Sequence, residues 1–99
     1  MLHLNGLGHF HPETEIDNAF LVSLEIGADE DWIAERVGIQ TRRTVLSKDY
    51  IRQTRNRDPR EAAEASAYTN PQTGALAARM AIERAGLSIN QIGWVVAGG

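Results

Sequence analysis

Cysteine is absent from this sequence of 99 residues, which excludes disulfide bonds, thiolate zinc sites and a cysteine nucleophile among these residues. No apolar run, such as Ala19–Val22 or Trp94–Ala97, exceeds a handful of residues. A membrane-spanning helix needs about 20, so no membrane partner is predicted. Met1-Leu2-His3 is not a basic region followed by an apolar stretch, so a secretory signal is not predicted. The compartment that these absences favour is the cytoplasm.

The remaining composition is that of an ordered globular chain. Hydrophobic residues make up 42% and charged residues 23% of the sequence, which is ordinary for a folded domain and excludes wholesale disorder. The length is sufficient for one small domain and too short for two. We therefore treat residues 1–99 as one segment with a shared fold.

Charge is distributed unevenly along the chain. Residues 1–41 carry eight acidic side chains and one basic side chain, whereas residues 42–60 carry seven basic and two acidic ones. A basic block of this size indicates a local anionic partner rather than general affinity for nucleic acid. The alternative is a solvated face that pairs with the acidic segment.

The first half of the chain predicts short elements. Leu2 and Leu4 alternate with polar residues as in a strand, and Gly6 and Gly8 then predict a tight turn. The expected elements that follow are a helix capped by Asp17 or Asn18, a helix from Asp29 to Gly38, a strand at Ile39–Val45 and a short helix after Ser47.

The second half predicts helices and a final strand. We expect an exposed loop at residues 53–60, a helix over Pro59–Tyr68 capped by Asp58, and a helix from Asn70 to about Ala85. Ser88 and Gln91 predict one capped turn. Trp94–Ala97 is typical of a strand buried on both faces of a parallel sheet.

A helix followed by a buried strand is the second half of a βαβ unit. Such a protein places its functional loop where this strand ends, here at Gly98–Gly99. No covering helix follows, and a small parallel sheet with one bare face makes a poor independent domain. These residues are therefore expected to be an N-terminal piece of a larger protein.

Two side chains stand out as ligand candidates. Trp32 and Arg36 lie four apart and share a face of the predicted helix, close in sequence to Arg42 and Arg43. An indole can stack on a purine, and guanidinium groups can hold phosphates. The alternative is that Trp32 is buried in the core.

Other motifs predict no site. His9 and His11 have no third ligand at a recognisable spacing, so no metal site is predicted. Pro12 prevents the helix that a dinucleotide-binding loop at Gly6 and Gly8 would require.

The segment from Asp29 to Arg43, DEDWIAERVGIQTRR, resembles the signature near the N-terminus of β-ketoacyl-acyl carrier protein synthase III, a member of the thiolase superfamily. Stretches on both sides support the resemblance. They are Gly6-Leu7-Gly8, Pro12 and Asp17-Asn18-Ala19 upstream, and Ala77–Leu87 and Ile92–Val96 downstream. The similarity covers nearly the whole chain except about residues 44–70.

The resemblance implies an α/β fold, the N-terminal part of a thiolase-like αβαβα layered domain that is incomplete on its own. It implies an acyltransferase, homodimeric at full length, that condenses an acyl-CoA primer with malonyl-acyl carrier protein in fatty-acid or polyketide synthesis. Trp32 would stack on the adenine of coenzyme A, and Arg36 would help to hold that ligand. The coenzyme A thioester is a substrate, and no further cofactor is implied.

The sequence departs from the family pattern in several places. Val37 stands where the family has a threonine, Ala28 replaces a frequent hydroxyl residue, and residues 44–70 are longer than the usual connection, which predicts an insertion. The catalytic Cys, His and Asn of the family would lie beyond Gly99, so the piece alone is predicted to be inactive. The alternatives are a starter-unit acyltransferase of a secondary-metabolite pathway, or a non-catalytic binding fragment if the chain naturally ends at Gly99.

Overall fold

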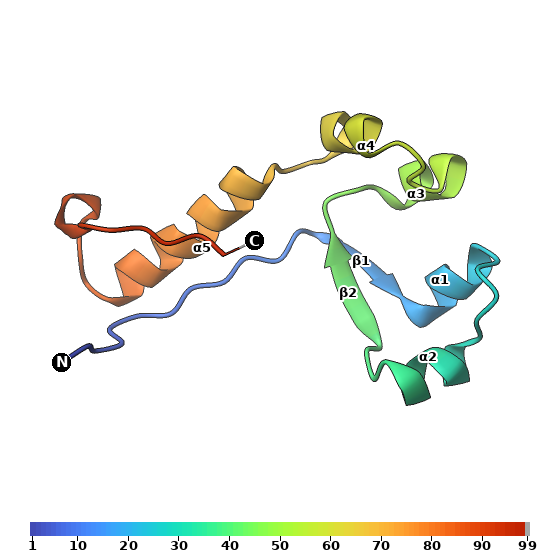
Figure 1. The fold of residues 1–99 in the computed structure, drawn as a ribbon, viewed down its shortest axis with the longest axis horizontal. Coiled ribbons are helices and arrows are strands. Elements are labelled where there is room, and N and C mark those ends of the chain that lie inside the picture. The colour runs from blue at the N-terminus through green and yellow to red at the C-terminus, as the bar shows by residue number, and fades with distance from the viewer. Residues whose placement is uncertain (99) are drawn as a thin grey trace. The chain divides into compact units, whose positions relative to one another are not determined.

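The computed structural model describes residues 1–98. The elements in chain order are β1 (Thr14–Asp17), α1 (Asn18–Ser23), α2 (Glu30–Arg36), β2 (Thr41–Thr44), α3 (Lys48–Thr54), α4 (Pro59–Ala65), α5 (Asn70–Arg84) and the 3-10 turn η1 (Ile89–Gln91). The architecture is mixed α/β, as the sequence predicts, with five α-helices and one two-stranded antiparallel sheet in the described residues (Figure 1). None of these helices is long and apolar enough to cross a membrane.

The chain divides into two compact units. Residues 11–69 form the first, which we call the sheet unit because it contains β1, β2 and helices α1–α4. Residues 1–10 and the chain from Asn70 onward form the second, which we call the α5 unit.

The sheet of the sheet unit pairs two strands that the sequence separates by α1 and α2. Glu15 lies opposite Arg43 in the register, and their side chains form an ion pair at 3.6 Å. The guanidinium of Arg43 also donates to the carbonyl oxygen of Pro12 at 3.0 Å. Strand β2 lies within the predicted strand at Ile39–Val45, whereas β1 was not predicted, although Ile16 alternates there with polar neighbours.

The core of the sheet unit is small and lies against α1. Ile16, Phe20 and Leu24 are buried together, with Leu21 and Ile51 packed against them. The aromatic ring of Phe20 is covered from outside by cations, since the Arg52 guanidinium lies 5.1 Å and the Lys48 ammonium 5.8 Å from its centroid. A cation over a ring stabilises the pair by about 0.5–1 kcal/mol at exposed sites.

Most of the basic block makes contacts within the chain. Arg55 donates to the carbonyl of Leu24 near the end of α1, and Arg57 donates to the carbonyl of Thr54 at the end of α3. Cations near a helix C-terminus interact favourably with its exposed carbonyls. Among the ion pairs of the described residues, the one that joins the basic block to the acidic segment is Arg43 with Glu15.

Two boundaries expected for the helices between residues 47 and 68 were wrong. Residues 53–60 are not one loop, because α3 continues to Thr54 and α4 begins at Pro59. The helix expected over Pro59–Tyr68 ends at Ala65. Ser66 leaves the helical conformation with ψ 137, and the next backbone N–H donates to the carbonyl of Val45 instead of continuing the helix.

The helix caps were largely predicted. Asp17, Asp29, Ser47 and Asp58 each accept a hydrogen bond from a backbone N–H of the first helical turn. Ser88 and Gln91 form the capping box of η1. After α5, the N–H of Leu87 donates to the carbonyl of Ile82 around Gly86, which has a φ of 71. This is the left-handed stop that the glycine permits.

In the α5 unit, the N-terminal segment is extended and lies along α5. Gly6 and Gly8 do not form the expected turn. A Cβ added at Gly8 would lie 2.0 Å from the carbonyl oxygen of Ala77, and one at Gly6 would lie 2.4 Å from that of Ala81. Glycine is therefore required here for close packing of backbone on helix.

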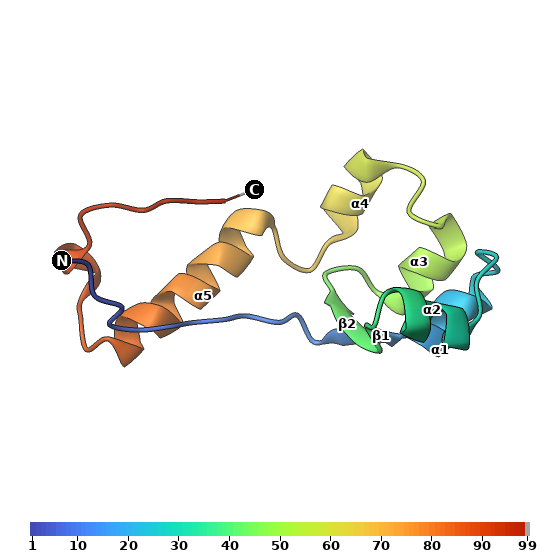
Figure 2. The same ribbon diagram turned by 60° about the horizontal axis from the view of Figure 1, so that its bottom comes forward.

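The strands expected at Leu2–Leu4 and Trp94–Ala97 are also corrected. No strand is assigned to either segment, and Trp94 is 89% exposed rather than buried between two faces. Both segments run extended beside α5 (Figures 1 and 2) without a ladder partner in the described residues. An apolar run becomes a buried strand only where neighbouring strands and covering helices meet it. The expected functional loop at Gly98–Gly99 includes Gly99, which lies outside the described residues.

Candidate functional site

Helix α2 carries the two side chains that the sequence singles out. Asp29 caps the helix, and its carboxylate accepts the backbone N–H of Trp32 at 2.7 Å. Ile33 is the one buried residue of α2 and anchors the helix to its unit. The helix ends after Arg36, and the N–H of Gly38 donates to the carbonyl of Ala34. A short helix is thus fixed at both ends and along one face.

Trp32 and Arg36 lie on the solvent side of this helix. Trp32 is 52% exposed, so its indole is neither buried in the core nor fully free. Arg36 is exposed one turn further along, and in residues 1–98 its guanidinium makes no ion pair. Residues four apart on a helix are neighbours. The two side chains therefore form one small surface of an aromatic ring and a cation, which we call the Trp32–Arg36 face.

Arg42 and Arg43 have other partners. Arg42 donates to the Asn18 side-chain oxygen at 3.0 Å and to the carbonyl of Ile39 at 3.3 Å. Arg43 pairs with Glu15 and donates to the carbonyl of Pro12, as described above. Of the four side chains grouped by the sequence, Trp32 and Arg36 share a surface, while the two later arginines hold the sheet unit together.

Asn18 is a structural residue that sequence reasoning identified only as a possible cap. Its buried amide donates to the carbonyl of Ile39 at 3.0 Å and accepts from Arg42. These bonds tie the start of α1 to the connection between α2 and β2. A buried amide with both ends satisfied fixes its neighbours strongly.

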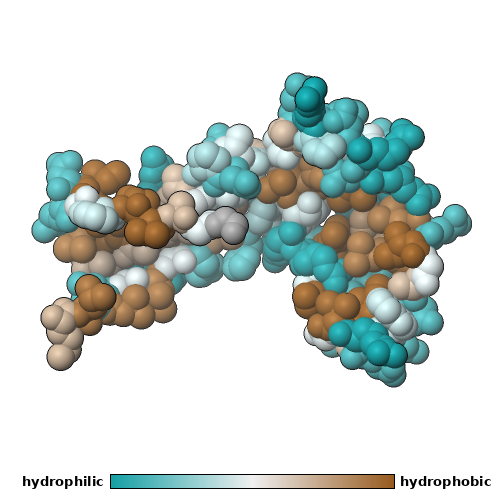
Figure 3. Space-filling model, viewed as in Figure 1, coloured by the Kyte–Doolittle hydropathy of each residue, from teal (hydrophilic) through white to brown (hydrophobic). Residues whose placement is uncertain are grey.

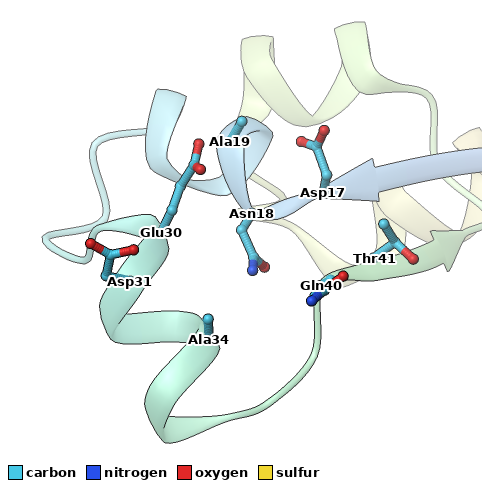
Figure 4. A pocket seen from close by; sticks show the side chains of 8 residues that line it. All are labelled: Asp17, Asn18, Ala19, Glu30, Asp31, Ala34, Gln40 and Thr41. Carbon is cyan, nitrogen blue, oxygen red and sulfur yellow. The ribbon is translucent and has the colours of Figure 1, made fainter.

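A shallow hollow of about 360 Å³ lies on the opposite side of α2 from Trp32. Its lining residues are Asp17, Asn18, Ala19, Glu30, Asp31, Ala34, Gln40 and Thr41. Figure 4 shows Asn18 and Gln40 facing Ala34 of α2 across the open space. At about 100° per residue, Glu30 and Ala34 project away from Trp32 and Arg36.

The hollow and the Trp32–Arg36 face differ in charge. Three carboxylates line the hollow, those of Asp17, Glu30 and Asp31, and no basic side chain lines it. Phosphate groups are repelled by such a surface and attracted by an unpaired guanidinium. Neither Trp32 nor Arg36 lines the hollow.

Ionisable side chains elsewhere give one clear coupled pair. The hydroxyl of Tyr68 donates to the carboxylate of Glu13 at 2.7 Å. This hydrogen bond is the main reason that the pKa of Glu13 is lowered from its ordinary value of 4.5 and the pKa of Tyr68 is raised from 10.0. The bond joins the beginning and the end of the sheet unit and makes no contact with α2.

In the described part of the chain, no group of three or more histidine, aspartate or glutamate side chains is placed so that it could hold a metal ion. Comparisons with protein-family models, with curated proteins and with solved structures found no match to this chain.

Proposed function

We propose that this chain is part of an acyltransferase resembling β-ketoacyl-acyl carrier protein synthase III, and that α2 contributes to the binding of acyl-CoA. The observation that carries the proposal is the half-exposed indole of Trp32 with Arg36 one turn away, a residue that makes no ion pair within residues 1–98. The resemblance of residues 29–43 to the family signature supplies the identity of the ligand.

The chemistry of this face suits a nucleotide with attached phosphates. Stacking requires one open face of an aromatic ring, which a half-exposed indole offers. Four residues of helix correspond to about 6 Å along the axis, so a base stacked on Trp32 leaves its phosphates within reach of Arg36. The phosphates could otherwise lie in the hollow on the other side of α2, but the carboxylates that line it would repel them.

The role proposed for these residues is ligand binding. In the condensation reaction, a cysteine thiolate attacks the thioester carbonyl of acyl-CoA, and the coenzyme A thiolate leaves. This sequence contains no cysteine, so the acylated group would be outside these 99 residues. Malonyl-acyl carrier protein as acceptor and a homodimeric full-length enzyme belong to the same proposal.

Fluorescence of Trp32 tests the proposal directly. In the Trp94→Phe variant, Trp32 is the only tryptophan, and coenzyme A should quench it with saturation. Pantetheine, which lacks the adenine and the 3′-phosphate, should not. Arg36→Gln should raise the Kd and flatten its dependence on ionic strength, because one charge contact is lost.

Arg60→Gln is the matched control, since Arg60 is another exposed arginine of a short helix. Its Kd and salt dependence should equal those of the parent. Equal quenching by coenzyme A and pantetheine, or equal effects of the two arginine substitutions, would remove the basis of the proposal.

A further inference from the structure

The α5 unit has much exposed apolar surface and, in its described part, no buried residue. In this unit Trp94 is 89%, Val95 85% and Val96 88% exposed. Large exposed apolar patches on a soluble protein mark interaction sites. The buried hydrophobic residues of the described chain all belong to the sheet unit, and they are Ile16, Phe20, Leu24, Ile33 and Leu46.

An apolar groove lies beside these exposed side chains. It has a volume of about 810 Å³, and its lining includes Ala78 and Ile82 of α5 and Val95 and Val96 of the segment after η1. A Cβ added at Gly74, which also lines the groove, would meet nothing within 4 Å, so this flank of the helix is open. Figure 3 shows apolar atoms gathered over this unit. We call the groove together with residues 94–96 the α5 surface.

The area that the chain leaves exposed is sufficient for a stable interface. An unfolded chain of 10.9 kDa exposes about 15,800 Å², whereas this folded chain exposes 8080 Å². Folding thus buries about half of the surface, while even a domain of about 60 residues buries about 60%. The shortfall is about 1800 Å², more than twice the area of about 800 Å² that each partner contributes to a standard interface.

The low charge of the α5 unit indicates the chemistry of the partner. Its charged side chains are Arg79, Glu83 and Arg84, and Arg84 donates to the carbonyl of Leu7 at 3.2 Å. They contribute +1 to a chain whose formal net charge is −3, so the negative charge resides in the sheet unit. A nucleic acid or an acidic protein is attracted by a strongly basic surface. A nearly neutral apolar surface fits another nearly neutral apolar surface.

A second copy of the chain offers such a surface. In a dimer with twofold symmetry, the same patch of each copy covers that of the other, so a strongly charged patch would repel itself. The α5 surface avoids this repulsion. Twofold dimers are also by far the commonest soluble oligomers.

We propose that the α5 surface is the interface of a twofold dimer of this chain. Association covers the groove and Trp94, Val95 and Val96 in both copies at once, and the removal of this apolar surface from water drives it. No residue of α2 is involved. The dimer therefore neither requires coenzyme A binding nor is disproved by its failure, and the ligand proposal is equally independent of the dimer.

Sedimentation equilibrium of the 99-residue chain over a range of concentrations tests the dimer. Interfaces of standard size give a Kd of about 1 µM or tighter, so the mass should be that of two chains well above this concentration. Val96→Asp places a charge in the interface of each copy and should raise the dimer Kd at least tenfold. Because Val96 is exposed and lies in no helix, helical circular dichroism should be unchanged.

Val37→Asp is the matched control, since Val37 is a half-exposed valine of the sheet unit. Its dimer Kd should equal that of the parent. Fluorescence locates the interface independently. In the Trp32→Phe variant, Trp94 is the only tryptophan, and its emission should shift to shorter wavelengths as the concentration rises through the dimer Kd, because the indole leaves water.

Three results would overturn the proposal. The first is a monomer at about 100 µM, far above the Kd of a standard interface, which would leave the groove to a different polypeptide. The second is an assembly that keeps growing with concentration, since a twofold interface closes at two copies. The third is an equal effect of Val37→Asp and Val96→Asp on the dimer Kd.

Discussion

The carboxylate of Asp29 accepts the backbone N–H of Trp32 at 2.7 Å. The residue that we propose to stack on the ligand therefore lies in the capped first turn of α2. The position of the indole is therefore coupled to the start of α2. Glu30 and Asp31 also lie in that turn, where negative charge is favoured.

Removing this cap should affect both folding and binding. Asp29→Ala should lower the free energy of unfolding by about 1 kcal/mol, since an alanine cannot accept the N–H of Trp32. Coenzyme A binding should weaken in the same variant. Asp29→Asn retains an acceptor oxygen and should restore both properties in urea unfolding and in ligand titration. An unchanged unfolding midpoint in Asp29→Ala would show that the cap does not hold the helix.

The hydrogen bond from Tyr68 to Glu13 predicts a pH dependence of stability. The pKa of Glu13 is lowered in the folded state, so its contribution is present above the ordinary value of 4.5 and is lost as the pH falls through the folded-state pKa. The pKa of Tyr68 is raised, so its contribution is present below 10.0 and is lost as the pH rises through the folded-state pKa.

Tyr68→Phe removes the bond and tests this dependence. The parent should have a higher unfolding midpoint than the variant at neutral pH, and the difference should shrink at both acidic and strongly alkaline pH. Midpoints measured in urea across the pH range give the comparison. If the difference between the two midpoints stayed constant from acidic to alkaline pH, the Tyr68 hydroxyl would stabilise the fold without the Glu13 carboxylate.

Two glycines of the α5 unit should respond oppositely to the same substitution. Gly8→Ala places a methyl group against the backbone of Ala77 and should destabilise the chain by about 1–3 kcal/mol. Gly74→Ala adds a methyl group in open space within a helix and should stabilise it by about 0.5–1 kcal/mol. Helical circular dichroism during urea unfolding reports both, and equal shifts would contradict the packing around Gly8.

Truncating the buried ring of Phe20 should cost more stability than removing the cation that lies over it. Phe20→Ala should lower the free energy of unfolding by about 3–5 kcal/mol, because it removes a buried ring from a small core. Arg52→Gln should cost at most about 1 kcal/mol, because the cation over the ring is exposed to solvent. A larger loss from Arg52→Gln than from Phe20→Ala would reverse this account of the core.

Local signals in the sequence predicted the helices well and the strands poorly. The caps at Asp29 and Asp58 and the stop at Gly86 depend on residues within one helical turn, so they can be identified without knowledge of the fold. A strand depends on a partner that is distant in sequence. Thr14–Asp17 pairs with Thr41–Thr44, whereas the more apolar run at Trp94–Ala97 has no partner in the described residues.

For the candidate site too, local relationships were predictable from the sequence and distant contacts were not. That Trp32 and Arg36 share a face follows from helical spacing alone. The partners of Arg42 and Arg43 could not be predicted, because Asn18 and Pro12 lie 24 and 31 residues away from them. The acidic hollow is likewise lined by residues from three separate stretches of chain. That Trp32 does not line it could therefore be learned only from the fold.

The central claim is that Trp32 binds the adenine of coenzyme A rather than supporting the core. The most direct test is to measure the Kd for coenzyme A by calorimetry and the free energy of unfolding by urea for Trp32→Ala, with Trp94→Ala as the control at the other exposed tryptophan. A stacking role predicts that Trp32→Ala raises the Kd about ten- to hundredfold, with a stability loss well below the about 3–5 kcal/mol expected for a buried tryptophan. Trp94→Ala should leave the Kd unchanged. A large stability loss with an unchanged Kd for Trp32→Ala would contradict the claim.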